Sequence, residues 1–508
     1  MRIYNTKPTV YSIVFLALLF YSCSGSEDTD TPTPNPPISE VKCEGSISLT
    51  LKDIGNDNLN LSWTTNGDYL EYDIEYGPSG FTIGQGTRIR VNTSSVKIQN
   101  LVTNTSYDIY ARGVCSNNFG SWTTAQSFTT QCNVGFYEGD IFLYTQDDVD
   151  SFGAMCYSGV NGDLHIRGYA DNSEEPKIID LSPLANLQEV TGFLFILGND
   201  TLENVDGLEG LRRVGHLYIG SNEKLTSIES LSGIEEIYGE LTTYTADDTE
   251  GLAINFCPSL TSLEGLQNIS SVVRLTIMNN DSLEDLNGLR GLSNISYNAD
   301  LSRNIALTSL MGLNQLESVG NGFDLRELNS LPSLEGLENL KNVGRLSIVL
   351  NQSLLSLSAI SNLESVNELF IKGNNNLESL AGVDLNVVQN KFSLEGGLFN
   401  DLTGIAATST SATVIIEKSP NLISLRGLES LEAAKEIIVS LNVELTSLSG
   451  LNGLRNVDSR IYINNNLKLN NFCALDGLIN IGGFSGVWAV DRNLLNPTLE
   501  DMQNGICN

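Results

Sequence analysis

The chain has 508 residues, of which 61 are acidic and 28 are basic, so its formal net charge at neutral pH is −33. A field of that sign repels nucleic acid, and the sequence holds no basic patch with aromatic residues to offset it. The two histidines, His165 and His216, have no partner at zinc-binding spacing, and no Gly-x-Ser-x-Gly elbow or phosphate-binding loop is present. We therefore predict a protein that is not an enzyme, uses no cofactor or metal, and binds no nucleic acid.

The N-terminus, residues 1–22, has the composition of an export signal. Arg2 and Lys7 precede an apolar run over residues 10–21 that is too short to span a membrane. Residues 23–42 are polar, acidic and rich in proline and threonine, so we expect an extended tether with no core.

Cys23 directly follows the apolar run and precedes an acidic stretch. This order of residues resembles the signal of bacterial lipoproteins, and the acidic stretch is similar to the surface-display mark of the Bacteroidota. The resemblance implies that Cys23 becomes the lipidated N-terminus. It also implies that the chain meets the membrane only through this lipid, at the outer membrane and facing the cell exterior. The alternative is an ordinary secreted protein in which Cys23 is incidental.

Residues 43–131 contain short alternating strands separated by Gly, Asn and Asp, a spacing typical of a β-sandwich. Trp63, Tyr76 and the segment 101–107, which reads Leu-x-x-x-Thr-x-Tyr, resemble the fibronectin type III domain. The resemblance implies that the tryptophan packs between two sheets and that the tyrosine closes a corner. It also implies a spacer rather than a binding module.

From Leu164 to Ile463 the chain repeats one pattern, Leu-x-Ile-x-x-Asn followed by an apolar residue at every third position. The Asn slot recurs in steps of 22 to 24 residues, with one step of 35 that predicts an insertion at about residues 242–251. A period of this length is the signature of a solenoid, in which each coil buries its apolar face against the next. The slot is occupied by Asn199, Asn222, Cys257, Asn280, Asn304, Leu328, Asn351, Asn374, Gly397, Ser419, Asn442 and Asn466.

Within one coil the spacing of apolar residues changes. Alternation before the Asn, as in Leu275-x-Ile277, predicts a short strand with two inward side chains. The strict spacing of three that follows predicts a bent path with one inward residue on each short side. The Asn amide can bond backbone groups of adjacent coils, and we expect Cys257, in the same slot, to be structural.

This pattern resembles the receptor L domain, a leucine-rich right-handed β-helix found in insulin- and EGF-type receptors and in many bacterial surface proteins. The resemblance covers residues 132–508 and implies an all-β chain: a fibronectin type III-like sandwich, then a solenoid of about thirteen coils between Cys-containing caps. The receptor domains are shorter and richer in Cys, so their ligands are not carried over.

The chain has eight cysteines, and lipidation of Cys23 leaves seven in a compartment where disulfides persist. In a fibronectin-type topology the start of the first strand and the end of the sixth share a pole, which implies one bridge there. Two further pairs flank the first and last coils, whose exposed cores need caps. The predicted pairs are Cys43 with Cys115, Cys132 with Cys156, and Cys473 with Cys507.

The candidate binding site lies on the outer face of the strands. The residue between the two inward positions of each strand faces solvent, and successive coils place these residues in a column. Aromatic and apolar residues gather at both ends of the column, where clusters of this kind mark contact sites. Phe195 and Tyr218 would stack on a sugar, and His165 would donate a hydrogen bond. The candidate ligand-binding residues are His165, Phe195, Tyr218, Phe370, Ile415, Ile438 and Tyr462.

Two alternatives weaken this site. The insertion at residues 242–251 can cover one end of the column, and residues 482–496, with Trp488, can cover the other. Calcium stays open as a ligand, although no complete EF-hand-type loop is present. The acidic groups that could offer oxygens are Asp147, Asp148 and Asp150, and Asp247, Asp248 and Glu250.

We therefore expect a lipid-anchored surface protein that binds an extracellular glycan or protein through the strands of its solenoid. One alternative is an enzyme that degrades extracellular polysaccharide with carboxylates from different coils. Another is a purely structural subunit of the cell envelope.

Overall fold

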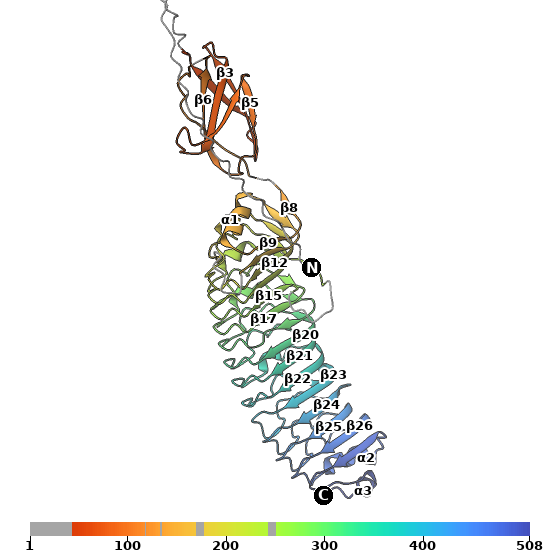
Figure 1. Cartoon of the computed structure of the whole chain (residues 1–508). Coiled ribbons are helices and arrows are strands. Elements are labelled where there is room, and N and C mark those ends of the chain that lie inside the picture. Colours follow the sequence, from red (N-terminus) through yellow and green to blue (C-terminus); the bar gives the residue numbers. More distant parts are fainter. Residues whose placement is uncertain (1–42, 117, 133–134, 169–176, 242–249) are drawn as a thin grey trace, which may run out of the picture.

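The structure is a computed structural model that describes residues 43–116, 118–132, 135–168, 177–241 and 250–508. The predicted signal peptide, the tether with Cys23, and Asp247 and Asp248 of the insertion lie outside the described residues. No helix within the described ranges is long and apolar enough to cross a membrane. The chain is all-β, with 9% helix, and consists of a sandwich followed by a long solenoid (Figure 1).

The sandwich has two antiparallel sheets, ordered β1-β2-β5 and β4-β3-β6-β7. Trp63 is 4% exposed and packs edge-on against Tyr72, with ring centroids 5.1 Å apart. The hydroxyl of Tyr107 accepts a hydrogen bond from the backbone N–H of Val102 at 2.9 Å and closes the predicted corner. The strands are β1 (Ile47–Lys52), β2 (Leu59–Thr65), β3 (Glu71–Pro78), β4 (Thr87–Val91), β5 (Ser95–Ile98), β6 (Ser106–Val114) and β7 (Gln126–Thr129).

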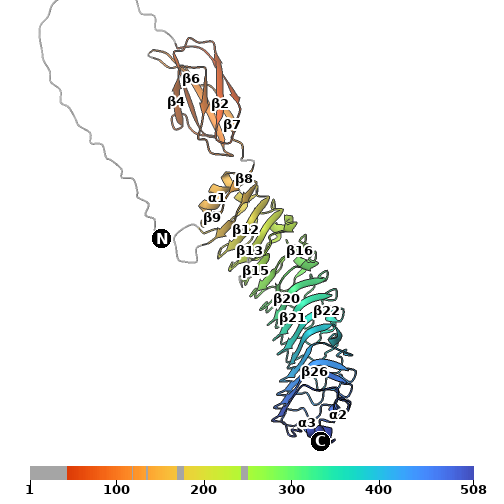
Figure 2. The same cartoon turned by 90° about the vertical axis from the view of Figure 1, so that its right-hand side faces the viewer.

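The solenoid is a parallel β-structure of about 15 turns, and its coils stack into an elongated body that Figure 2 shows from the side. Each strand pairs with the equivalent strand of the next coil. The strands of its first half are β8 (Phe136–Glu138), β9 (Ile141–Leu143), β10 (Gly159–Asn161), β11 (Leu164–Arg167), β12 (Glu189–Leu197), β13 (Arg213–Gly220), β14 (Glu236–Ile237), β15 (Leu252–Asn255), β16 (Ser271–Val272), β17 (Leu275–Met278), β18 (Asn294–Ile295) and β19 (Ala299–Asp300).

The second half of the solenoid has longer strands and ends in two short helices. Its strands are β20 (Ser318–Arg326), β21 (Asn342–Val349), β22 (Ser365–Lys372), β23 (Val388–Glu395), β24 (Thr413–Glu417), β25 (Ala433–Ser440), β26 (Asn456–Asn464) and β27 (Val487–Asp491). The helices are α1 (Gln146–Ala154) in the first coil and α2 (Asp476–Asn480) and α3 (Leu499–Gln503) in the last, and the 3-10 turns are η1 (Ser182–Leu184), η2 (Glu229–Gly233), η3 (Asn287–Leu289), η4 (Ser358–Ile360), η5 (Leu385–Val387) and η6 (Cys473–Leu475).

After the Asn slot an apolar residue occurs at every third position, and each of these residues points from one short side of the coil into the core. Leu283, Leu286 and Leu289 are all fully buried, and the coil turns tightly at η3 between the last two. Burial of one such side chain contributes roughly 1.5–3 kcal/mol. The stacked coils therefore share one continuous apolar core, as the repeat predicts.

Buried asparagines form a hydrogen-bonded ladder along one corner of the solenoid. The Asn280 side-chain amide donates to the carbonyl of Ile254 at 2.9 Å, and its Oδ1 accepts from the backbone N–H of Cys257 at 3.0 Å. Cys257 is buried in the same column, and burial raises the pKa of its thiol, which fits the structural role predicted for it. The residue before the slot turns left-handed, with φ of 57° at both Phe256 and Asn279.

The predicted number of coils is too low. The β9 and β27 strands add one turn at each end, so thirteen coils become about 15. Residues 482–496 do not cover the end of the strands, because β27 lies within them and pairs in parallel with β26. Trp488 is partly buried against the core, and its indole N–H donates to the carbonyl of Pro497 at 2.9 Å.

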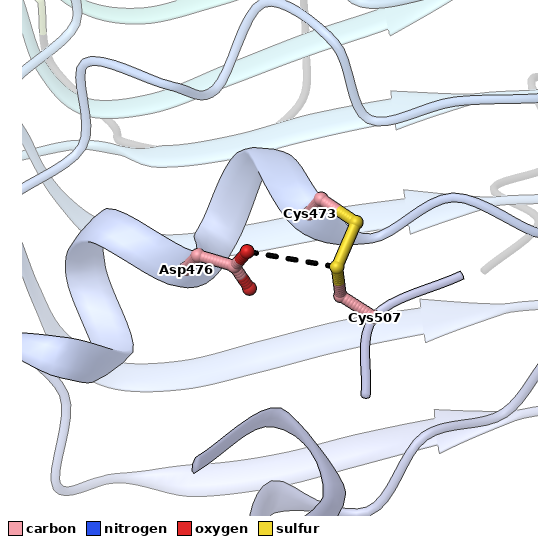
Figure 3. Close-up of side chains that lie close together, drawn as sticks. All are labelled: Cys473, Asp476 and Cys507. Atoms are coloured by element: carbon pink, nitrogen blue, oxygen red, sulfur yellow. Dashed lines mark hydrogen bonds between the residues drawn. A yellow bond between two sulfur atoms is a disulfide. The ribbon is translucent and has the colours of Figure 1, made fainter. Parts of the chain in front are cut away.

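Two of the three predicted disulfides are present, Cys43–Cys115 and Cys473–Cys507. The second ties η6 to the C-terminal segment and closes the last coil (Figure 3). The third prediction is wrong for this structure, in which Cys132 and Cys156 are thiols. Burial, together with a hydrogen bond to Cys132, raises the pKa of Cys156 to about 12.

Candidate functional site

The seven predicted binding residues lie in one unbroken column on the outer face of the sheet. Each is the direct parallel-ladder partner of the residue one coil away, so the register holds from the first strand to the last. We call this set the strand column. Its members are Phe142, His165, Phe195, Tyr218, Ala253, Thr276, Asp300, Asp324, Ser347, Phe370, Ser393, Ile415, Ile438, Tyr462 and Ala489.

The first three members of the column stack on one another, and the fourth, Tyr218, is tilted by 55° against Phe195. The ring centroids of Phe142 and His165 are 4.2 Å apart with an interplanar angle of 11°, and those of His165 and Phe195 are 4.6 Å apart at 15°. Tyr218 continues the row at 5.9 Å from Phe195. His165 therefore has a stacked ring on each face, whereas Phe195 has His165 stacked on it and Tyr218 tilted beside it, and stacking of a sugar on Phe195 stays a prediction.

The surroundings of both histidines lower their pKa values. Burial lowers the pKa of His165, although the Asp163 carboxylate acts in the opposite direction. His216 is buried beside Phe193, with ring centroids 4.3 Å apart, and burial lowers its pKa as well. Its Nδ1 accepts a hydrogen bond from the backbone N–H of Gly251 at 2.8 Å, so the proton of the neutral ring sits on Nε2. His216 thus joins two coils and is not an exposed ligand-binding group.

The fifth and sixth members of the strand column are buried and do not reach the surface, so we call this stretch closed. Ala253 is 0% exposed and Thr276 is 1% exposed, although both alternate outward from the sheet. This closure divides the column into an aromatic end and a longer second part. Residues 242–249, which are adjacent in sequence to the closed stretch, lie outside the described residues.

A polar hollow of about 260 Å³ opens beyond the closed stretch, and its lining residues come from the four successive strands β19 to β22. In it the guanidinium of Arg345 pairs with the carboxylate of Asp324 at 2.8 Å. Arg326 reaches the same hollow from the end of β20, and Phe370 forms an apolar wall. The hollow is lined by Asp300, Asp324, Arg326, Arg345, Ser347 and Phe370.

Phe370 lies beside two cations, Lys372 on its own strand β22 and Lys391 on the neighbouring strand β23. The ammonium groups of Lys391 and Lys372 lie 5.3 Å and 5.7 Å from its ring centroid. Attraction between a cation and an exposed ring contributes about 0.5–1 kcal/mol. These contacts hold the ring at the edge of the polar hollow and place positive charge beside it.

The last predicted residues form a more apolar strip. Ile415 and Ile438 are neighbours in the column and are half-buried. Tyr462 follows, with the guanidinium of Arg460 5.7 Å from its ring centroid and its hydroxyl bonded to the side chain of Asn464. Tyr462 is therefore held in place by polar neighbours and presents a fixed ring.

The acidic residues considered for calcium do not form a cluster within the described parts of the chain. Asp148 accepts from the backbone N–H groups of Tyr144 and Thr145 and caps α1. Asp150 accepts from Gln146 at 2.8 Å instead of turning toward Asp148.

The described residues contain one close group of potential metal ligands, Cys473, Asp476 and Cys507 (Figure 3). Its two sulfur atoms are bonded to each other, and Asp476 Oδ2 lies 3.5 Å from the sulfur of Cys507. This group is therefore a structural bridge, because a metal needs the thiolate form of cysteine.

A second hollow was not predicted from the sequence. It has a volume of about 490 Å³ and lies at the corner of the coils, beside the residues that precede and follow the Asn slot. The available signal was Phe256, an aromatic residue directly before the slot, where other coils have Gly198 or Ser221. Among the described coils that turn left-handed at this position, Phe256 is the one aromatic residue, which makes it informative.

Comparison with known proteins identifies the first part of the chain. Residues 46–129 match the family model of the fibronectin type III domain. The sortilin-related receptors of Oryctolagus cuniculus and Homo sapiens are 29% identical over 108 and 111 residues, which is 21% of this chain and 5% of theirs. The chain thus spans about a twentieth of the length of these relatives.

Among solved structures, the FN1–FN3 domains of chicken CNTN1 cover 16% of this chain at 22% identity, with 29% of that chain aligned and a TM-score of 0.16. Pectate lyase PelI from Erwinia chrysanthemi, in complex with tetragalacturonic acid, covers 82% of this chain and 85% of its own at 10% identity, with a TM-score of 0.15. Similarity this low says nothing about the activity of this chain. The chain is a fibronectin type III domain followed by a parallel β-solenoid of about 15 turns.

Proposed function

We propose that the solenoid is a recognition module that binds an extracellular glycan or protein through the strand column. The observation that supports this proposal is the polar hollow, where a carboxylate, a guanidinium and an aromatic ring converge from successive coils. Binding sites commonly combine a concave surface with a few convergent polar groups and an apolar wall. Here Arg326 donates to ligand acceptors, and Phe370 contacts apolar ligand surface. Asp300, whose Oδ1 accepts from the backbone N–H and the hydroxyl of Ser302, adds negative charge to the hollow.

The scaffold makes such a site rigid. Asp324, Ser347 and Phe370 all sit on paired strands, and the Asn ladder fixes the coil behind each strand. A ligand therefore binds without ordering a loop, which avoids a cost of about 0.5–1.5 kcal/mol for each immobilised side chain. This arrangement suits adhesion, in which equivalent positions on successive coils of the strand column contact one extended ligand.

The location of the protein is part of the same proposal. Lipidation at Cys23 anchors the chain to the outer membrane, and the fibronectin type III domain acts as a spacer between the anchor and the solenoid. Two disulfides in the described residues support an oxidising compartment. Release of the protein from intact cells by protease, with its loss from the membrane in a Cys23→Ser variant, tests the anchor.

A second function has one observation in its favour. Asp300 and Asp324 are direct ladder partners and line the same hollow, so two carboxylates lie one coil apart on the face where a polysaccharide would lie. Paired carboxylates at short separation are the chemistry of glycoside hydrolysis. Incubation with a polysaccharide panel, with measurement of new reducing ends, separates this function from simple binding. An Asp300→Asn variant is the control.

The experiment that tests the main proposal is binding of the full-length protein, in detergent, to arrays of glycans and extracellular proteins. The Arg326→Gln/Phe370→Ala double variant is compared with the wild type. Glu335→Gln is the matched control, because Glu335 is exposed and does not line the hollow. A ligand that is lost only from the double variant supports the proposal, and a ligand retained by all three proteins contradicts it.

A further inference from the structure

The second hollow differs from the strand column in position and in charge. Its floor is formed by Phe256, which is 52% exposed, and by Pro258, on either side of the Asn slot of one coil. Small residues, Ser221 and Asn279, stand beside Phe256 in the preceding and following coils and leave the ring accessible. We call this hollow the turn-edge groove. It is lined by Gly198, Asp200, Ser221, Glu223, Phe256, Pro258, Asn279 and Asp281.

Carboxylates frame this groove on both sides. Glu223 follows the slot one coil before Pro258, and Asp281 follows it one coil after, so each is displaced by about 4.8 Å along the solenoid. No basic residue lines the groove. Within the described parts of the chain, neither carboxylate has an ion pair or a hydrogen-bonding partner. At the same edge two coils further on, Arg303 pairs with Glu327 at 3.1 Å.

The fold itself does not require an aromatic residue at this point. The position turns left-handed in the successive coils from Gly198 to Arg492, and Gly198 and Gly373 occupy it with φ of 67° and 66°. Any residue with a Cβ carries a backbone cost in this conformation that glycine does not. Phe256 is outside the core, so it does not recover that cost through burial.

We propose that the turn-edge groove binds a basic side chain, preferably arginine, of a partner protein. An arginine guanidinium stacks on an aromatic face, and flanking carboxylates bind its N–H groups. The charge of the groove matches this occupant, because Asp200, Glu223 and Asp281 bring three negative charges and no positive one. This inference goes beyond the proposed function of the strand column, since it concerns a different edge of the coils and a different ligand chemistry.

Hexa-arginine and hexa-lysine peptides of equal charge test this inference by fluorescence anisotropy with the full-length protein. Phe256→Leu keeps the net charge and is compatible with the backbone, because Leu350 and Leu441 adopt φ of 59° and 58° at the same position. Asp281→Asn removes one charge in the groove, and Glu335→Gln removes one charge elsewhere. Thermal unfolding of each variant is measured alongside.

We expect the wild type to prefer hexa-arginine over hexa-lysine by at least about threefold, and Phe256→Leu to lose that preference. Asp281→Asn is expected to weaken hexa-arginine binding about three- to fivefold, and Glu335→Gln by less than twofold. An unchanged preference in Phe256→Leu overturns the inference. Equal effects of the two charge variants overturn it as well, because they would indicate attraction to net charge alone. Binding of maltohexaose that depends on Phe256, without the arginine preference, would show a neutral-sugar site instead.

Discussion

Replacing Asn351 with alanine removes two hydrogen bonds from the buried ladder of the solenoid. Its amide donates to the carbonyl of Leu325 at 3.0 Å, and its Oδ1 accepts from the backbone N–H of Leu328 at 2.9 Å. All three residues are fully buried, so water does not replace the lost partners. A buried polar group left without a partner costs about 1–3 kcal/mol, so two of them reduce the free energy of unfolding by about 2–6 kcal/mol.

The assay is urea-induced unfolding followed by circular dichroism, with native-state hydrogen exchange at the Leu328 amide as a local measurement. Asn362→Ala is the matched control, because Asn362 is exposed and donates one hydrogen bond, to the carbonyl of Glu338 at 2.8 Å. We expect this control to lose no more than about 0.5 kcal/mol. If Asn351→Ala unfolds within 1 kcal/mol of the control, the ladder does not hold the coils together as described.

Three further predictions concern the caps and buried groups. Breaking the Cys473–Cys507 bridge, which spans 34 residues, should lower the unfolding free energy by about 3–4 kcal/mol, measured for the Cys473→Ser/Cys507→Ser protein. Burial lowers the pKa of His216 in the folded state, so its contribution to stability is present above pH 6.5 and is lost as the pH falls through the folded-state pKa. The free energy of unfolding of His216→Gln, measured by urea titration, should therefore fall less than that of the wild type between pH 7 and pH 5. Burial raises the pKa of the Cys156 and Cys257 thiols, so iodoacetamide should modify them at pH 7 only after unfolding, as peptide mass spectrometry would show.

Much of the fold could be predicted because its determinants are local in sequence. The Asn slot places a hydrogen-bonding amide at the corner of each coil, as Asn280 illustrates, and the spacing of three places an apolar residue in the core, as Leu283 illustrates. The same holds for the sandwich, where Trp63 and Tyr107 occupy the expected positions. These features depend on the backbone path of a single coil.

The terminal coils could not be counted from the repeat. The strand containing Phe142 precedes the first Asn slot. Asn493, which ends the ladder, follows Asn466 after 27 residues, outside the regular steps of 22 to 24. Terminal coils of solenoids have atypical sequences because they cover the core instead of stacking on both sides. For the same reason residues 482–496 were expected to be a cover and are instead a strand.

The candidate site could be predicted only in outline. Alternation along each strand shows which residues face outward, and that placement holds for the whole strand column. Side-chain contacts between coils do not follow from alternation. Stacking of Phe142 on His165, burial of Ala253, and pairing of Arg345 with Asp324 each depend on side chains about 21 or more residues apart.

The central claim is that the strand column recognises a ligand through the polar hollow. The most direct test is the affinity of the wild type and of Phe370→Ala for the array ligand that binds most tightly, measured by surface plasmon resonance with matched unfolding curves. We predict that Phe370→Ala binds at least about tenfold more weakly while its unfolding is unchanged, because truncation of a central aromatic contact has this effect at binding sites. Equal affinity of the two proteins would contradict the claim and would place recognition elsewhere on the chain.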